Sequence, residues 1–545
     1  MDLSRRSLLA GSVAFVGLGA LAACGGDNKS GSGSGGGGGA AVIVNGTEPQ
    51  NALVPTNTNE IGGGRVIQSI FSGLMYYKED GSAEPDLAES VESDDSKVWT
   101  VKLKADQKYS DGSVITAQDF VDSWNYGAAA ANGQLLQSFF DPIEGFAEVA
   151  EEGSTIKEMK GLKVEDDTTF TVTLVAPQSD FAQRLGYSAY MPMPPSAFKD
   201  MKAFGEKPIS SGPYKLETWS HDQEIVTVPN EHYNGPRKAK NGGITYRIYL
   251  EDDTMYNDLL SDAVDVTDTI PPSRLSTFQD ELGERSVNAP GAVFQSITFS
   301  PTDKNYQGEA GKLRRQAISR AINRESICKN LFFDSRTPAT DFVAPVIEGG
   351  GATDIKGAEV LQYDKAKAKE LWDKAEAMQK FEGEFTLGYN SDGPHKDWVE
   401  AVCNSVKEAL GVKATPKPFP EFGKFREQIT NRKMPGAFRS GWQADYPSMF
   451  NFLGPIYSSA AADGKGSNDA DYKNPEFDKL LAEGLSATDT EGALAKFKEA
   501  QALLMEDLPA IPLWYQNSLG GFSNVVKDVK YAWDTTPIYY EITKE

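Results

Sequence analysis

A single carboxylate in an aromatic loop is the strongest candidate for chemistry in this chain. The segment FRSGWQADYPSMFNFL covers residues 438–453. Its acid, Asp445, has four aromatic neighbours in sequence: Trp442, Tyr446, Phe450 and Phe452. Because a buried charge is costly unless it is compensated, the carboxylate is solvated, paired with a basic side chain, or paired with a cationic ligand. Taken alone, these residue types favour a structural explanation in which the rings are core and Asp445 caps a turn.

The sequence lacks the patterns of common catalytic sites. The motifs G-x-x-x-x-G-K-[ST], H-E-x-x-H and G-x-S-x-G do not occur in the folded part of the chain. Three histidines, His221, His232 and His395, are a thin supply for a histidine-rich metal site. Acidic runs such as 251–253 are most simply solvated in a chain with 78 acidic residues. We therefore predict no catalytic residue, no metal and no cofactor, and a protein that is not an enzyme.

The N-terminus has the pattern of an export signal. Arg5 and Arg6 precede an apolar, small-residue segment over 7–23, which is short for a membrane span. LAAC, at 21–24, resembles the lipobox of bacterial lipoproteins, in which the signal is removed before the cysteine and the thiol becomes lipidated. The resemblance implies a signal peptide over 1–23 and lipidation at Cys24; an ordinary secretory signal with a chance cysteine is the alternative. The arginine pair leaves secretory and twin-arginine export both open.

Residues 24–40 follow as the expected lipidated cysteine and a Gly/Ser-rich tether. Such a composition cannot bury a core and spans on the order of 20 Å as a flexible coil. No later apolar run approaches the length of a transmembrane helix. We therefore expect an exported protein that is anchored by lipid to the outer face of the cell membrane.

Charge and cysteine content restrict the partners. With 54 basic and 78 acidic residues the formal net charge is −24, which argues against nucleic acid and anionic lipid surfaces as partners. Cationic or zwitterionic ligands are compatible with it. Cys328 and Cys403 leave two alternatives open, a disulfide in an exported protein or two unpaired buried thiols.

Strand and helix patterns alternate through residues 41–545, which exceed the size of a single core and predict two or three domains. Apolar and polar residues alternate as in half-buried strands in three segments: 99–104, 169–175 and 244–250. Thr116 and Asp119 form a capping-box pattern at a helix start. Apolar residues recur at helical spacing in three further segments: 313–333, 368–378 and 399–410, the last ending at Gly411. The fold class is α/β without an internal repeat.

A family resemblance is carried by five segments, in this order: 88–124, 209–236, 313–327, 439–453 and 472–481. They resemble the large solute-binding proteins of peptide-type ABC importers, family 5 of the bacterial extracellular solute-binding proteins. Residues 88–124 resemble its signature strand, turn and helix, and residues 209–236 resemble its G-P-Y strand and N-x-x-Y turn. LRRQAISRAINRESI, at 313–327, matches a family helix. The loop RSGWQADYPSMFNFL and the later YKNPEFDKLL, at 472–481, resemble the ligand loop and the helix after it.

The resemblance implies a two-lobed, class II periplasmic-binding-protein fold with an extra subdomain inserted in the N-terminal half. Two lobes joined by crossing strands would enclose the ligand between them. Lobe I is then expected from three segments: 41–72, 208–297 and 512–545. The inserted subdomain would cover 73–207, and lobe II would cover 298–511.

The resemblance also gives Asp445 a role. In oligopeptide-binding members the acid of the G-W-x-A-D-Y segment pairs with the α-ammonium of the peptide, and Asp445 occupies that position in GWQADY. Enclosure strengthens such a pair by lowering the local dielectric constant. The backbone of Gly441, Trp442 and Gln443 would run beside the peptide like an added strand. Trp442 and Tyr446 would form the wall of a side-chain pocket.

Further site residues follow from the same resemblance. Arg439 matches the arginine before G-W, which meets a ligand carboxylate and suits it through its planar fork. His395 matches a histidine that meets the carboxylate of a longer peptide, with a surface histidine as the alternative. Glu60, or Asn59 if the register slips by one residue, matches an acid of the N-terminal loop. Arg432 matches an upstream basic residue. Gln443 stands where the enteric relative has a disulfide cysteine, so that disulfide is not expected.

The resemblance therefore implies a monomeric binding protein that captures oligopeptides through their backbone and termini and delivers them to the permease subunits of an ABC importer. The same fold could bind another solute, such as a dipeptide, a sugar, or a nickel or haem complex. An exported hydrolase would need a nucleophile and a base facing one pocket. A surface adhesin would show an exposed apolar patch instead of an enclosed cavity.

Overall fold

The structure is a computed structural model that describes residues 39–544. The predicted signal peptide over 1–23 and the predicted lipidation site Cys24 lie outside the described residues. Among the helices of 39–544, none combines the length and the apolar character needed to cross a membrane.

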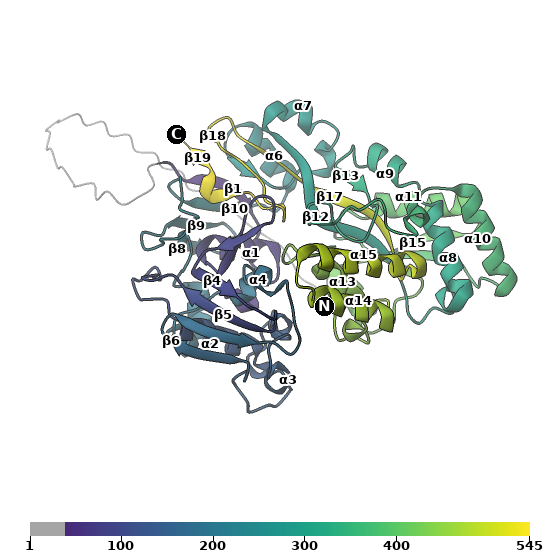
Figure 1. The fold of residues 1–545 in the computed structure, drawn as a ribbon. Coiled ribbons are helices and arrows are strands. Elements are labelled where there is room, and N and C mark those ends of the chain that lie inside the picture. Colours follow the sequence, from purple (N-terminus) through teal and green to yellow (C-terminus); the bar gives the residue numbers. More distant parts are fainter. Residues whose placement is uncertain (1–38, 545) are drawn as a thin grey trace, which may run out of the picture. The chain divides into compact units, whose positions relative to one another are not determined.

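One mixed sheet of 11 strands organises most of the chain (Figure 1). Its order is β15 (Ala414–Phe419), β14 (Phe385–Asn390), β16 (Ala437–Gln443), β12 (Ser286–Phe299), β17 (Ala510–Phe522), β11 (Val266–Thr267), β1 (Val42–Gly46), β10 (Ile244–Ile248), β9 (Glu224–Pro229) and β8 (Tyr214–Ser220), with β13 (Arg336–Pro338) pairing β17. Strands β12 and β17 are long antiparallel partners whose register runs from Ser286↔Gly521 to Thr298↔Ala510. They continue the sheet from β11 on one side to β16 on the other, so the predicted boundaries at 297/298 and 511/512 fall inside them.

A separate four-stranded sheet lies within residues 73–207. Its order is β4 (Ala88–Glu92), β5 (Val98–Leu103), β7 (Thr169–Thr173) and β6 (Leu162–Asp166). Helix α2 (Ala117–Ala128) packs on it, and its N-terminus has the predicted capping box of Thr116 and Asp119. Three predicted strands are confirmed as β5, β7 and β10, because apolar residues alternate inward on each. Two separate two-stranded sheets are also present: β2 (Met75–Tyr77) with β3 (Ala83–Pro85), and β18 (Val526–Lys527) with β19 (Thr543–Lys544).

Three predicted helical segments are also present, with one correction. The segment 313–333 is two helices, α8 (Gly308–Ala321) and α9 (Arg324–Asn330), because Asn323 begins a new helix by accepting a hydrogen bond from the Ser326 amide. The other two are α10 (Lys365–Met378) and α11 (Lys396–Leu410), which ends at Gly411 with φ +72°. The remaining helices are α1 (Ile61–Ile70), α3 (Phe146–Val149), α4 (Phe181–Arg184), α5 (Met201–Glu206), α6 (Asp252–Leu260), α7 (Phe278–Leu282), α12 (Phe422–Thr430), α13 (Met449–Tyr457), α14 (Pro475–Leu485) and α15 (Thr490–Asp507).

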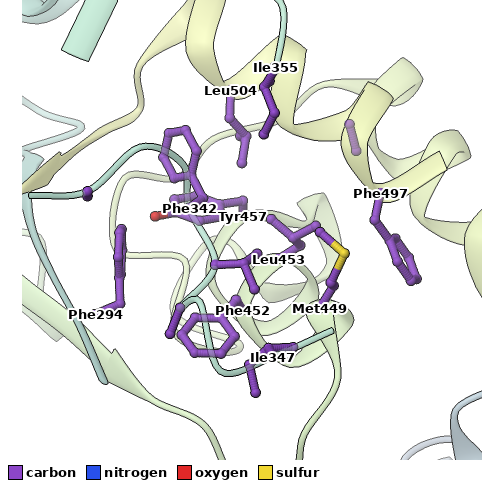
Figure 2. Packing of buried hydrophobic residues seen from close by; sticks show 14 of the residues in the cluster. Phe294, Phe342, Ile347, Ile355, Met449, Phe452, Leu453, Tyr457, Phe497 and Leu504 are labelled. Atoms are coloured by element: carbon purple, nitrogen blue, oxygen red, sulfur yellow. The ribbon is translucent and has the colours of Figure 1, made fainter. Parts of the chain in front are cut away.

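A buried apolar cluster holds the loop that carries Asp445. Figure 2 shows Phe452, Leu453 and Tyr457 of α13 packed with Phe342 and with Leu504 of α15. The rings of Phe342 and Tyr457 meet edge to face at 5.3 Å. Each fully buried side chain of this size contributes about 1.5–3 kcal/mol. The two ends of the loop, β16 and α13, are therefore fixed by sheet pairing and by this core.

The cysteines Cys328 and Cys403 are buried and unpaired. Burial raises the pKa of each thiol to about 12, so both remain protonated at neutral pH. Of the two alternatives from the sequence, the structure has the unpaired thiols.

Candidate ligand-binding site

Strand β16 has an open edge. Strand β12 pairs with it along its whole length, from Ala437 to Gln443. On the other side β14 pairs only with Ala437 and Phe438, so the backbone of residues 439–443 has no strand beside it within the described chain. An extended ligand could add there as a further strand. Gly441 is needed at this point, since a Cβ there would lie 2.7 Å from the Phe294 carbonyl oxygen.

Asn451 of α13 fixes the loop that follows β16. Its side-chain oxygen accepts hydrogen bonds from the Asp445 amide at 3.0 Å and from Trp442 Nε1 at 2.9 Å. Its Nδ2 donates to Asp445 Oδ2 at 3.0 Å. One amide side chain therefore sets the positions of both the carboxylate and the indole. Asn451 was not predicted from the sequence, because it belongs to no site motif and only its closeness to Asp445 in sequence distinguishes it.

Asp445 is held in a poorly solvated position without a cationic partner. Burial raises the pKa of its carboxyl to about 6, against the opposing effects of the Asn451 amide, the Tyr187 hydroxyl and the more distant Arg184. No lysine, arginine or histidine of residues 39–544 lies within 4.0 Å of it as an ion pair. Arg184 pairs instead with Asp180 at 3.6 Å. The carboxylate is therefore neither freely solvated nor paired with a base, which leaves its charge for a ligand to compensate.

Tyr446 does not border the site in the way expected. The residue is 2% exposed, and its ring lies under the Arg184 guanidinium, with 5.1 Å from Arg184 Cζ to the ring centroid. Arg184 also lies 5.5 Å from the Phe450 ring. The adjacent Ser448 donates from Oγ to Asp180 Oδ2 at 3.0 Å. Tyr446 thus packs against helix α4.

A cavity of about 300 Å³ lies along β16 and contains Arg439 and Trp442 in its lining. Arg439 Nε donates to Asn390 Oδ1 at 2.6 Å, and the guanidinium lies 5.4 Å from the Phe422 ring and 5.3 Å from the Phe425 ring. Burial, with a contribution from Arg426, lowers the Arg439 pKa to about 10. No carboxylate in the described part of the chain pairs with Arg439. It is therefore a cation available to a ligand carboxylate.

Arg426 was not foreseen from the sequence. It lines the same cavity and pairs with Asp469 at 2.7 Å. No motif marks it, because it reaches the cavity from α12, a helix with no recognisable site pattern.

His395 lies near Arg439 and is neutral. Trp398 Nε1 donates to His395 Nδ1 at 3.2 Å, which places the proton of the neutral ring on Nε2. Burial, followed by the charges of Arg439 and Arg336, lowers the His395 pKa to about 3. At neutral pH it could therefore donate one hydrogen bond to a ligand but would not bring a charge.

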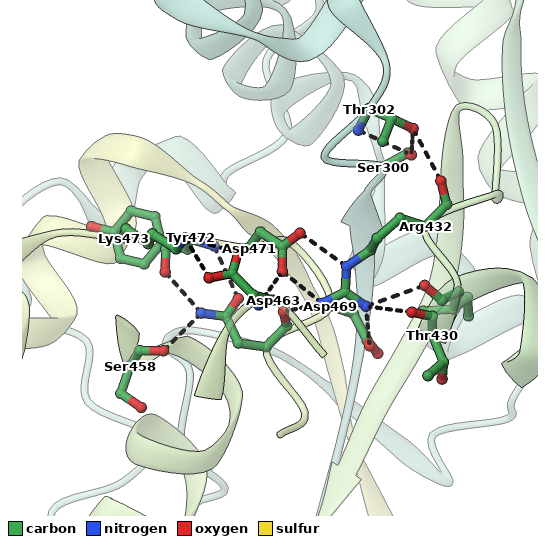
Figure 3. Close-up of polar contacts among 12 residues, drawn as sticks. Ser300, Thr302, Thr430, Arg432, Ser458, Asp463, Asp469, Asp471, Tyr472 and Lys473 are labelled. Atoms are coloured by element: carbon green, nitrogen blue, oxygen red, sulfur yellow. Dashed lines mark hydrogen bonds and ion pairs between the residues drawn. The ribbon is translucent and has the colours of Figure 1, made fainter. Parts of the chain in front are cut away.

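Arg432 is engaged by the protein itself. Its Nη2 lies 2.6 Å from Asp471 Oδ1, its Nε donates to Asp471 Oδ2 at 2.9 Å, and its Nη1 donates to the Thr430 carbonyl (Figure 3). A weaker pair joins it to Asp469 at 3.9 Å. These contacts occupy the guanidinium nitrogens of Arg432, so the protein itself compensates the charge of this residue without a ligand.

The N-terminal-loop position is a helix cap. Glu60 Oε1 accepts from the Gly63 amide at 2.9 Å at the start of α1, while Asn59 is exposed. Glu60 lines a different cavity, of about 510 Å³, together with Glu48 and Asp252. Gln443 Nε2 donates to the Asp534 carbonyl oxygen at 3.2 Å and so ties the end of β16 to the C-terminal segment.

Residues 82–464 match the middle region of the bacterial extracellular solute-binding proteins, family 5. This chain belongs to that family. It is 28% identical over 533 residues to the periplasmic oligopeptide-binding protein OppA of Salmonella typhimurium, with 94% of each chain covered. It is 26% identical to the dipeptide-binding protein DppE of Bacillus subtilis, covering 89% of this chain and 88% of that protein.

Solved structures confirm the fold. The Escherichia coli murein tripeptide binding protein MppA superposes with a TM-score of 0.76 at 22% identity, covering 93% of this chain and 98% of that one. Haemophilus influenzae OppA in complex with RPPGFSPFR gives 0.73 at 22% identity, covering 93% and 99%. The predicted two-lobed, class II binding-protein fold is thus confirmed. The family and its relatives are solute-binding proteins rather than enzymes, and several relatives are named periplasmic.

Proposed function

We propose that this protein captures oligopeptides through their backbone and termini. The observation that carries the proposal is Asp445, a half-buried carboxylate that the protein holds in place but does not pair with a base. A peptide α-ammonium supplies the missing charge. A charge-assisted hydrogen bond in such an enclosed place is about twice as strong as one between neutral groups.

The surroundings of Asp445 suit the rest of a peptide. The open edge of β16 offers backbone donors and acceptors to an extended chain without reading its side chains. Arg439, at the other end of this edge, binds the carboxylate of the peptide, and neutral His395 donates one hydrogen bond to it. The relatives named as oligopeptide- and dipeptide-binding proteins agree with this assignment.

The proposal places the protein in a transport system. We infer that a lipid on Cys24 anchors it as a monomer to the outer face of the cell membrane, with the Gly/Ser-rich residues 25–40 as the tether. From there it delivers its ligand to the permease subunits of an ABC importer. The lipobox-like LAAC sequence and the Gly/Ser-rich segment support the anchor.

Calorimetric titration with two peptide pools tests the capture of peptides. The full chain is titrated with tri- to octapeptides carrying free N-termini and with the same pool after N-acetylation. We expect micromolar or tighter binding of the free pool and loss of binding after acetylation, because acetylation removes the ammonium charge. Asp445→Asn should weaken binding, whereas Asp373→Asn, an exposed change on α10, should not.

Two results would argue against the proposal. Equal binding of the free and acetylated pools would remove the role of Asp445 as an ammonium anchor. The absence of binding to both pools would reject oligopeptides and direct the search to sugars and metal complexes.

A further inference from the structure

A third, smaller cavity lies beside the position of Asp445. It has a volume of about 100 Å³ and lies between β2 and residues 532–540 of the C-terminal segment. Tyr77 and Trp533 form an aromatic wall, with their rings edge to face at 5.5 Å. Since one water position needs about 10–15 Å³ by this measure, the cavity is large enough for a ligand side chain.

Several contacts place this cavity next to Asp445. Gln443, two residues before Asp445, donates from Nε2 to the Asp534 carbonyl oxygen at 3.2 Å. A Cβ on Gly81 would lie 3.2 Å from Pro447 and 3.3 Å from Trp533, so the loop after Asp445 lies beside the Trp533 wall. After burial, the charges of Asp445 and Asp534 both contribute to the raised pKa of Tyr77. Gly186 lines the cavity and is followed by Tyr187, which is one of the groups that act on the pKa of the Asp445 carboxyl. A ligand side chain that begins at a backbone atom close to Asp445 would therefore enter this cavity.

Asp534 is presented to the cavity by a tight turn. The Ala532 amide donates to the Thr536 carbonyl at 2.8 Å, and the Thr535 amide donates to the Ala532 carbonyl at 2.9 Å. Thr535 has φ +76°, which is rare for a β-branched residue. The Trp533 amide donates to the Glu79 carbonyl at 3.0 Å, which fixes the turn against the β2–β3 hairpin. The position of the Asp534 carboxylate is therefore set by backbone contacts on several sides.

The charges of this cavity do not balance. Arg65 pairs with Asp268, and Arg237 pairs with Asp86 at 2.9 Å, so both cations in the lining are compensated. Asp534 accepts a hydrogen bond from the Thr536 amide at 3.0 Å but takes part in no ion pair within residues 39–544. The uncompensated charge of the cavity is therefore negative.

We propose that this cavity binds a basic side chain, lysine or arginine, of the first residue of the ligand, and that Asp534 determines that preference. The proposal rests on the proposed function, because Asp445 must hold the neighbouring α-ammonium. The aliphatic stem of the side chain packs against Tyr77 and Trp533, and its cation pairs with Asp534. An aromatic wall favours such a stem and head, since a cation is attracted to the faces of aromatic rings.

Titration of the full chain with three tetrapeptides tests the proposal. Lysine-Ala-Ala-Ala is compared with norleucine-Ala-Ala-Ala, which keeps the length of the side chain but lacks its charge, and with Ala-Lys-Ala-Ala. We expect the lysine-first peptide to bind about tenfold more tightly than either of the others, as for a hydrogen bond to a charged group. Asp534→Asn should reduce this preference to about twofold and leave the affinity for the norleucine peptide unchanged. The matched control Asp528→Asn, exposed on the same segment, should keep the full preference.

Each other outcome has a definite meaning. Equal affinity for the three peptides in the unmodified protein overturns the proposal without any variant and leaves peptide capture intact. A lysine preference that persists in Asp534→Asn, or that is equal for Ala-Lys-Ala-Ala, also overturns it, because the cation would then bind elsewhere. If none of the peptides binds, the proposed function fails and this proposal fails with it.

Discussion

Replacing Asp445 by asparagine should stabilise the empty protein while it weakens ligand binding. Burial raises the pKa of this carboxyl from 3.8 to about 6. A raised pKa means that the group stabilises the folded state below about pH 4 and that this contribution is lost as the pH rises through about 6. At pH 7 the folded protein therefore holds an ionised carboxylate at a cost of about 3 kcal/mol, from about two pKa units at 1.36 kcal/mol each. Asparagine has nearly the same shape and no charge.

The pH dependence makes this prediction specific. The same two pKa values give a stability gain for Asp445→Asn of about 3 kcal/mol at pH 7 but only about 1.5 kcal/mol at pH 5. Between pH 7 and pH 5 the affinity of the unmodified protein for an ammonium ligand should fall about tenfold, since ionised Asp445 falls from about nine tenths to one tenth. The affinity of Asp445→Asn should stay flat. Asp119, whose pKa burial also raises to about 6, titrates in both proteins and cancels in the difference.

Urea unfolding of the empty protein and calorimetry with a tripeptide, both at pH 5 and pH 7, measure these quantities. A variant that is less stable than the unmodified protein at pH 7 would refute the reasoning. So would a stability difference that is the same at both pH values. Either result would mean that Asp445 serves as a turn cap for its own loop, as the isolated sequence first suggested.

Three further predictions concern other parts of the molecule. Gly441→Ala should lower the free energy of unfolding in urea by about 1–3 kcal/mol, because the new Cβ would lie 2.7 Å from a carbonyl oxygen of β12. Gly423→Ala places its Cβ in open space and should not lower it. Equal effects of the two substitutions would contradict the close packing at Gly441. Arg432→Ala should destabilise the fold by about 1–3 kcal/mol through loss of its ion pair with Asp471, and it should leave peptide affinity unchanged. A loss of affinity without a loss of stability would instead make Arg432 a ligand-binding residue. Cys24→Ser should release the protein from membrane to soluble fractions, and retention at the membrane would rule out the lipid anchor.

The regular elements could be predicted from the sequence because their signals are local. The alternation of β5 and the apolar stripe of α11 each follow from the spacing of side chains within a single element. The break between α8 and α9 was missed although Asn323 is a good helix cap, because apolar residues continue at helical spacing across it. The pairing of β12 with β17 joins residues more than two hundred positions apart, and no local pattern records such a contact.

For the candidate site too, local sequence patterns predict some features, and others depend on residues far away in the sequence. Asp445 and Arg439 could be found because they lie within one short motif, but their electrostatic state depends on distant residues. Tyr187 and Arg184, which belong to another part of the chain, act on the pKa of Asp445 against the effect of burial, and Arg439 is held by Asn390 of β14. Arg432 and Arg439 look alike as basic residues near the motif. Only the partners distinguish them, since Arg432 has two carboxylates and Arg439 has none. A charge is available to a ligand only where the fold leaves it uncompensated, and compensation is a property of the whole fold.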